Sequence, residues 1–241
     1  MLTNIKQNIM KYLKLLSLLF ILLFSMSVIT SCSDDDEEIL LHPDNVCNGH
    51  EFVDLGLSVK WATCNIAITS EKHGDYFAWG ETSPRITSSW ENYKWCNGTA
   101  TSMTKYCYRS SDGTVDNKTV LELSDDVARV NWGGNWRMPT KAEFEELKDE
   151  NNCTWEWTTQ NEIEGYKVTS KINGNSIFLP AAGYRFRDGE LRGYGKFGNY
   201  WSSSLCTSNS SNAYYLNFNS SNVVWYDDYR YYGQSVRAVC P

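Results

Sequence analysis

The chain has 241 residues, of which 41% are hydrophobic and 21% charged, as expected for one globular domain or at most two. The formal net charge is -7, with 29 acidic residues against 22 basic ones. Because phosphate binding needs clustered lysine and arginine, this balance argues against a nucleic-acid ligand. Aromatic residues make up 14% of the chain, so a core is readily built.

The chain begins with a pattern typical of a secretory signal peptide, which we assign to residues 1–31. Lys11 and Lys14 precede the apolar run 15–24, and small residues then lead to Cys32. A membrane-spanning helix needs about 20 apolar residues, and serines interrupt this run too early. We therefore expect this segment to be an export signal.

The tetrad at 29–32, ITSC, resembles a bacterial lipobox, in which the thiol of Cys32 is acylated and becomes the new N-terminus. The alternative is plain cleavage near Ser31, which leaves Cys32 an ordinary thiol. Acyl chains would hold the protein on a membrane. The acidic block 33–38 cannot collapse and resembles the export signal of surface lipoproteins. We expect an outer-membrane lipoprotein exposed at the cell surface, in contact with the membrane only through this anchor, with a tether and linker at 32–50 and a folded domain at 51–241.

Short elements follow in chain order. Residues 52–62 read as a strand with a turn or bulge at Gly56, and the aromatic segment 74–81 as a second short strand. Residues 88–126 are polar and broken by glycines, which predicts long loops. Residues 235–240 read as a last strand.

The clearest local signal is a helix over residues 141–150. Thr140 and Glu143 have the spacing of a capping box, and Phe144 and Leu147 share one helix face.

Two turns are predicted after this helix. Asn173-Gly174 lies between the strand-like runs 166–170 and 176–180, which is a hairpin signal, and Asp188-Gly189 marks another turn.

The last stretch, residues 198–239, is dominated by Tyr, Asn, Ser and Asp and lacks Lys and Glu. Tyrosine supplies stiff contact area with a polar tip, and Ser and Asn supply adaptable hydrogen bonds, as in recognition surfaces. Tyr214, Leu216 and Phe218 alternate with Tyr215, Asn217 and Asn219, so one face can be buried while the other stays in water. We expect a ligand-binding face formed by Asn209, Asn212, Asn217, Asn219, Trp225, Tyr226, Asp227, Asp228, Tyr229, Arg230 and Tyr231. Tyr226, Tyr229, Arg230 and Tyr231 are the expected hot spots.

Six motifs together resemble the Fibrobacter succinogenes major paralogous domain family. They are VDLGLSVKWAT at 53–63, GDYFAWGE at 74–81, WRMPT at 136–140, LPAAGYR at 179–185, YWSS at 200–203 and SVR at 235–237. The resemblance covers nearly everything after the linker. It implies an α+β, C-type-lectin-like fold related to that of the formylglycine-generating enzymes, with a small twisted antiparallel sheet, one or two short helices and long loops.

Some proteins of this fold are targets of diversity-generating retroelements, which mutate adenines in a C-terminal segment and turn Asn codons into Tyr, Ser, Asp or Thr codons. The runs 207–212 and 226–231 look like such an outcome. A polar, aromatic β surface of ordinary origin is the alternative.

Seven cysteines remain once Cys32 is set aside, so at least one thiol stays unpaired. An exported chain can keep disulfides, and Cys96 with Cys107 is a plausible local pair, although spacing alone does not decide the connectivity. No Cys-x-x-Cys motif occurs.

Catalytic and metal motifs are weak. The three histidines, His42, His50 and His73, pair with no recognisable nucleophile. Four carboxylates, those of Asp112, Asp116, Asp125 and Asp126, could supply oxygens to a structural calcium ion, but the EF-hand spacing is missing. We expect no cofactor and no catalytic metal.

The sequence favours a surface-anchored module that binds a protein or glycan and is not an enzyme. The first alternative is an oxidoreductase of the formylglycine-generating type, with paired cysteines and a metal. That family's cysteine motif cannot be placed here residue by residue. The second alternative is a structural component of the cell surface.

Overall fold

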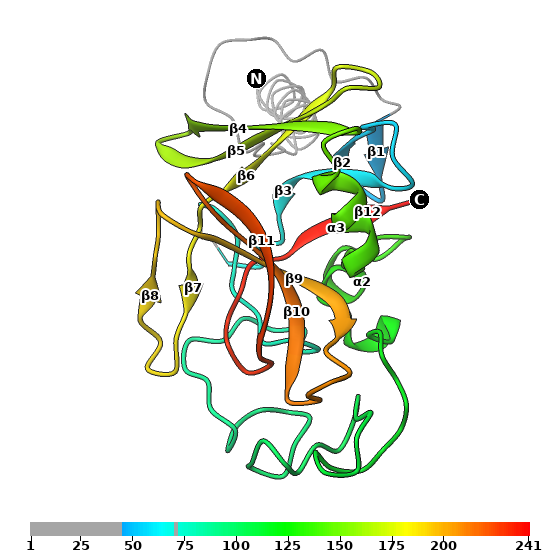
Figure 1. The fold of residues 1–241 in the computed structure, drawn as a ribbon, viewed down its shortest axis with the longest axis vertical. Coiled ribbons are helices and arrows are strands. Elements are labelled where there is room, and N and C mark those ends of the chain that lie inside the picture. Colours follow the sequence, from blue (N-terminus) through cyan, green and yellow to red (C-terminus); the bar gives the residue numbers. More distant parts are fainter. Residues whose placement is uncertain (1–44, 70–71) are drawn as a thin grey trace, which may run out of the picture. The chain divides into compact units, whose positions relative to one another are not determined.

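The computed structural model describes residues 45–69 and 72–241, and the expected signal peptide and Cys32 lie outside them. Antiparallel strands dominate these residues, and short helices accompany them (Figure 1). The fold is therefore a mixed α+β domain made mostly of strands, as the sequence predicted at that level.

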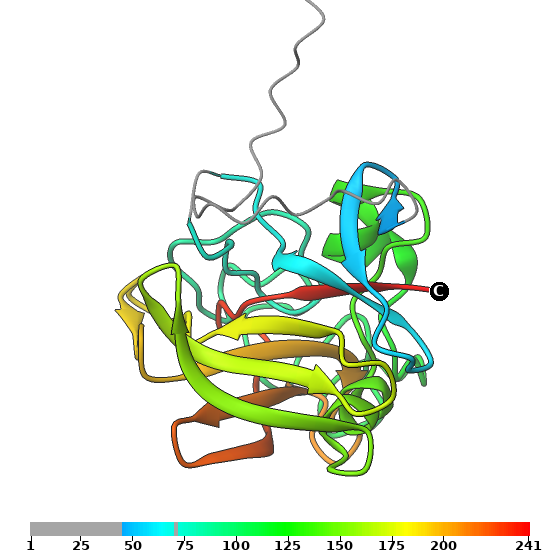
Figure 2. The ribbon, with the colours of Figure 1, turned by 90° about the horizontal axis from the view of Figure 1, so that it is seen from above.

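The two ends of the described chain meet in one four-stranded sheet. Its order is β1 (Val46–Cys47), β2 (His50–Val53), β3 (Lys60–Asn65) and β12 (Arg237–Cys240). Figure 2 shows β12, in red, running beside β3, in cyan. Because β1 pairs with β2 through Cys47 and His50, regular structure begins before the boundary expected at residue 51. Gly56, at φ 71°, lies in the turn between β2 and β3, so the predicted strand 52–62 is two strands.

The segment 74–80 is buried, but it is not the strand that its pattern predicted. The N–H groups of Asp75, Phe77 and Trp79 donate to carbonyls of three separate segments, at Ile66, Gln234 and Arg230. Only the Phe77 and Gln234 contact is a β-bridge. The glycines at both ends, Gly74 and Gly80, have positive φ, so the backbone turns before a ladder can form.

Helix α3 (Lys141–Lys148) confirms the predicted capping box. The Thr140 hydroxyl accepts a hydrogen bond from the Glu143 N–H at 3.3 Å, and the Glu143 carboxylate accepts one from the Thr140 N–H at 2.8 Å. Phe144 and Leu147 are fully buried, as their spacing predicted. The helix ends two residues earlier than predicted.

The short elements η2 (Leu123–Asp125) and α2 (Val127–Trp132) were not predicted. Asp126 caps α2 by accepting hydrogen bonds from the N–H groups of Ala128 and Arg129. Long loops were predicted for residues 88–126; residues 88–122 are indeed mainly loops and run in teal and green through the lower part of Figure 1.

A three-stranded antiparallel sheet and a separate two-stranded hairpin follow α3. The three-stranded sheet has the order β4 (Cys153–Gln160), β5 (Ile163–Ser170) and β6 (Ser176–Pro180). The predicted Asn173-Gly174 turn joins β5 to β6, with Gly174 at φ 80°, whereas β4 was not predicted. The predicted Asp188-Gly189 turn joins β7 (Tyr184–Arg185) to β8 (Leu191–Arg192).

The last sheet has the order β11 (Asn222–Tyr229), β10 (Asn212–Asn219) and β9 (Gly198–Leu205). Leu216 and Phe218 are fully buried in one apolar cluster, together with Tyr200 from β9 and Phe144 from α3. Side chains from the opposite face, such as Tyr215 at 8% exposure, enter a second apolar cluster. The predicted alternation is therefore right for Leu216 and Phe218, but Tyr215 is not on a wet face.

Candidate functional site

The predicted ligand residues on β10 and β11 divide between two faces of one sheet. Successive side chains of a strand point to opposite faces, and residues directly opposite on antiparallel strands share a face. Tyr226 pairs with Tyr215, whereas Trp225 pairs with Leu216, which is buried on the other side. We call the first side the tyrosine face, with Asn217, Asn219, Tyr226 and Asp228, and the second the groove face, with Asn212, Trp225 and Asp227.

Tyr226 is the most exposed aromatic side chain of the tyrosine face, with 54% of its surface in solvent. Its ring lies 6.2 Å from that of Tyr215, which is buried. Because Tyr215 is packed into the core, the exposed ring rests on a rigid support. Such a ring offers contact area with little conformational entropy to lose on binding.

Asp228 is half-buried on the same face, and no cation among the described residues bonds or neutralises it. Its carboxylate accepts a hydrogen bond from the N–H of Tyr229 at 2.8 Å. Burial raises the pKa of Asp228 to about 6, and the neighbouring charge of Asp227 acts in the same direction. The negative charge of Asp228 also acts on Tyr215, whose pKa is raised by burial first and by this carboxylate second.

Most of the predicted amide side chains are engaged within the protein. Asn217 donates to Asn199 at 2.7 Å, and Asn212 donates to Asp227 at 2.8 Å. Asn219 accepts from two N–H groups in the β10–β11 turn, and Asn209 accepts from Ser211 in the turn before β10. These amides hold the hairpin and its turns in shape, so they are weaker candidates for direct ligand contact than Tyr226 and Asp228.

The prediction that Arg230 and Tyr231 contact a ligand is wrong. Arg230 is 0% exposed and Tyr231 is 1% exposed. The ring of Tyr231 packs against Trp90 at 4.7 Å, and Arg187 donates to its hydroxyl at 2.7 Å. Tyr229, at the end of β11, is half-buried and contacts Trp90 at 5.4 Å, so part of its ring remains available.

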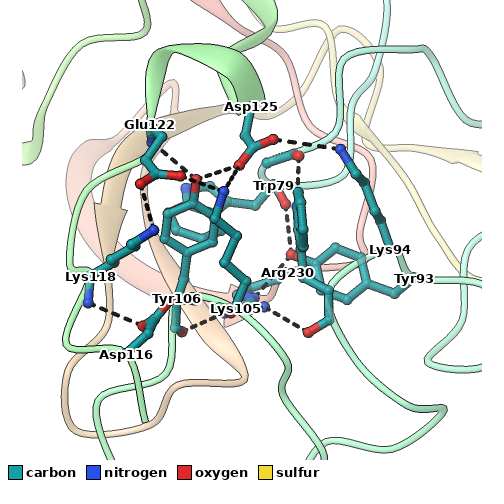
Figure 3. Close-up of polar contacts among 12 residues, drawn as sticks. Trp79, Tyr93, Lys94, Lys105, Tyr106, Asp116, Lys118, Glu122, Asp125 and Arg230 are labelled. Carbon is teal, nitrogen blue, oxygen red and sulfur yellow. Dashed lines mark hydrogen bonds and ion pairs between the residues drawn. The ribbon is translucent and has the colours of Figure 1, made fainter. Parts of the chain in front are cut away.

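Arg230 instead ties the long loops to the core (Figure 3). Its guanidinium donates to the Tyr93 hydroxyl at 3.0 Å and to the carbonyls of Tyr106 and Ser210 at 2.8 and 3.0 Å. It also lies 5.3 Å from the centre of the Trp79 ring. The buried guanidinium group of Arg230 therefore donates hydrogen bonds to backbone carbonyls in loops that have no regular secondary structure.

The ion pairs beside Arg230 extend this framework. Asp125 is buried and bonds the ammonium group of Lys105 at 2.5 Å and the Tyr106 hydroxyl at 2.6 Å (Figure 3). Glu122 bonds Lys105 and Lys118, which lower the pKa of Glu122 to about 2. The network holds the loop 105–125 in place, and the sequence did not predict it.

The four carboxylates considered as calcium ligands have separate structural roles. Asp112 accepts from the Ser210 N–H at 2.8 Å, Asp116 accepts from N–H groups of the 106–107 backbone, and Asp126 caps α2. Within the described part of the chain, no group of three or more His, Cys, Asp or Glu side chains is arranged to hold a metal ion.

The groove face borders two shallow hollows that the sequence did not predict. One, of about 450 Å³, is lined by Lys148, Glu150, Cys153, Thr154, Trp155, Tyr166, Lys171, Asn222 and Val223. The other, of about 370 Å³, is lined by Glu145, Lys148, Asp149 and Trp225. Trp225 was singled out from the sequence, but the residues from α3 and β4 come together only in the folded chain.

The histidines and thiols of the described part of the chain form no recognisable catalytic group. His50 stacks on Trp132 at 4.0 Å, and burial lowers its pKa; His42 lies outside the described residues. Cys96 and Cys107 are free thiols that donate to different carbonyls, those of Trp90 and Arg109. The pair suggested by their spacing is therefore not formed.

Comparison of the chain with protein-family models, with curated proteins and with solved structures gave no match. In residues 45–69 and 72–241, no helix has the length and apolar character needed to cross a membrane.

Proposed function

We propose that the chain is a surface-anchored lipoprotein whose folded domain binds a protein or glycan ligand and does not catalyse a reaction. The tyrosine face is the proposed contact surface, with Tyr226 and Asp228 at its centre. Rigid aromatic area beside a polar group is typical of binding hot spots.

The main support for this proposal is the Asp228 carboxylate, which is half-buried and has a raised pKa. A half-buried carboxylate that no cation of residues 45–69 and 72–241 neutralises destabilises the folded state, because it loses hydration and gains little in return. A ligand that supplies a hydrogen-bond donor or a positive charge would replace the hydration that the Asp228 carboxylate loses on burial. Perturbed groups of this kind cluster at functional sites.

The fold and the anchor are proposed on separate grounds. Short helices, small antiparallel sheets and the long loops of residues 85–122 agree with the C-type-lectin-like fold implied by the sequence resemblance. The lipobox-like tetrad and the acidic block after Cys32 support acylation of that thiol and display outside the cell.

Binding is tested by presenting the purified protein to a glycan array and to a peptide array. For a true ligand, Tyr226→Ala and Asp228→Asn should each weaken binding at least tenfold. Tyr108→Ala is the matched control, because Tyr108 is 49% exposed and lies on a loop outside β9, β10 and β11. Ligands bound equally by all four proteins would show that the tyrosine face is not the contact surface.

The alternative of a formylglycine-generating type of oxidoreductase requires two reactive thiols at an accessible pocket. Of the seven described cysteines, Cys153 alone lines either hollow of the groove face, and it is 2% exposed. This arrangement favours the binding proposal. Metal analysis together with thiol titration of the native protein separates the two functions.

A further inference from the structure

Cys47 and Cys240 are brought together from opposite ends of the described chain. The indole of Trp136 donates to the Cys47 carbonyl at 2.6 Å. The next residue, Arg137, forms a two-way backbone bridge with Val239, with N–H to O distances of 3.0 and 2.9 Å. The Trp136-Arg137 segment therefore bonds both β1 and β12, the two outer strands of the four-stranded sheet.

The two thiols meet in the same apolar cluster. Both are free thiols in the structure: Cys240 is buried at 1% exposure, Cys47 is half-buried, and their side chains share a hydrogen bond. The thiols of Cys96 and Cys107 instead bond backbone carbonyls, and Cys206 contacts the Ser208 hydroxyl. The contact between the Cys47 and Cys240 sulfhydryl groups favours a disulfide, since side chains at hydrogen-bonding distance need only a small shift to reach disulfide geometry.

We propose that Cys47 and Cys240 form a disulfide that closes the two ends of the folded domain. This inference does not depend on the proposed ligand face. The oxidant is a disulfide donor, either a thiol–disulfide oxidoreductase or a small-molecule disulfide. The Cys47 thiolate, which is the more accessible, attacks the donor and releases one donor thiol. The Cys240 sulfur then attacks Cys47 and releases the second, so two protein thiols are oxidised as one disulfide is reduced.

Burial determines how this exchange proceeds. The apolar surroundings raise the pKa of Cys240 to about 12, and the neighbouring Cys47 thiol adds to the effect. At neutral pH Cys240 is thus a slow attacking group in the folded protein, and we expect the bond to form faster at alkaline pH. Once formed, its Cys240 sulfur is shielded from reductants, as in structural disulfides.

The positions of β1 and β12 in the sheet indicate a mechanical role for the proposed disulfide. Strand β1 is only two residues long and pairs with β2 alone, so it is weakly held. Strand β12 is buried and pairs with β3 on one side and with Arg137 on the other. A disulfide between them would pass tension applied at the N-terminal side of the domain to a buried strand that is hydrogen-bonded on both sides.

The direct test is peptide mapping of the whole chain after exposure to oxidised glutathione, with free thiols alkylated before digestion. We expect one linked peptide pair containing Cys47 and Cys240, lighter by two hydrogen atoms than the reduced pair. Reduction should lower the thermal midpoint by about 5 °C or more. Free, alkylated Cys47 and Cys240 after oxidation, or either one linked to Cys64 in the same cluster, would overturn the proposal.

Two variants distinguish the loss of the Cys47–Cys240 disulfide from the general effects of removing a thiol. Cys47→Ser should abolish both the linked pair and the dependence of the thermal midpoint on reductant. Cys153→Ala is the control, because Cys153 is buried in the other apolar cluster and should leave both unchanged. Peptide mapping of the unaltered chain tests for the Cys47–Cys240 disulfide even if a variant folds poorly.

Discussion

Two residues four positions apart in one polar, aromatic run, Tyr226 and Arg230, differ completely in burial. Tyr226 is exposed, whereas Arg230 lies behind the end of β11, where its N–H donates to the Ser211 carbonyl and the chain turns inward. Composition could not separate them, because both residue types are common in interfaces and Arg is rarely buried without a carboxylate partner. Arg230 is buried here because carbonyl groups of several loops accept its hydrogen bonds.

Substitution of these two residues should therefore have different effects on stability. Arg230→Met leaves several buried carbonyls without donors, and we expect it to lower the free energy of unfolding by about 3 kcal/mol or more. Tyr226→Ala removes an exposed ring and should change it by less than about 1 kcal/mol. Urea unfolding of both variants measures the difference. Equal losses would place Tyr226 in the core and remove it from the ligand face.

Asp228 gives a pH prediction with a definite sign. Burial raises its pKa to about 6 in the folded state, against about 3.9 in the unfolded chain. Between these values the folded protein binds more protons, so the contribution of this group is favourable at low pH and is lost as pH rises through about 6. Asp228→Asn removes the charge, so we expect it to be more stable than the parent at pH 7, by about 1 kcal/mol after discounting for partial exposure.

The measurement is the free energy of unfolding at pH 4 and pH 7. The two proteins should converge at pH 4, where the parent carboxyl is protonated. The buried Asp126, whose pKa burial also raises to about 6, is present in both proteins and cancels in the comparison. A less stable Asp228→Asn protein at pH 7 would mean that the carboxylate has a stabilising partner in the folded state.

At the scale of elements, the sequence was informative where a local rule decides the structure. The capping box of α3 and the two glycine turns were predicted because side-chain hydrogen bonds and positive φ act over a few residues. The segment 74–81 and the Arg230 contacts could not be predicted, since their hydrogen-bond partners lie far away in sequence. The prediction of a single ligand face was wrong for β10 and β11, because successive side chains of a strand point to opposite faces, and which face stays open depends on packing.

The pairing of β9 with β10 depends on a glycine that local rules do not identify. Gly198 lies opposite Phe218, and a Cβ atom there would come within 1.9 Å of the Phe218 ring. That ring stacks on Tyr200 at 5.6 Å. Gly198→Ala must therefore displace a fully buried ring, and we expect a loss of about 1 to 3 kcal/mol in unfolding free energy.

A second substitution tests the cause. In a Phe218→Leu background the smaller side chain makes room for the new methyl group, so Gly198→Ala should cost measurably less there than in the parent. Urea unfolding of the two single variants and the double variant gives the coupling energy. Strict additivity would mean that the glycine is needed for a reason other than the Phe218 ring.

At the scale of the whole molecule, the tyrosine face and the chain ends belong to different sheets. The face is built on β9, β10 and β11, whereas the strands at the two ends of the described chain lie in the sheet β1-β2-β3-β12. The end that would carry the proposed anchor therefore lies in a different sheet from Tyr226 and Asp228. This separation suits a module that is held at one end and binds with another surface.

The proposed lipid anchor is tested by partition of the protein into detergent and by its accessibility to protease on whole cells. Several acyl chains hold a protein on a membrane because each buried methylene contributes about 0.8 kcal/mol. The parent should therefore enter the detergent phase on phase separation, and Cys32→Ser should stay in the aqueous phase. Replacing the acidic residues of 33–38 with Asn and Gln should leave the protein in the detergent phase but make it resistant to protease added to whole cells. If Cys32→Ser still enters the detergent phase, acylation of this thiol is not what binds the protein to the membrane.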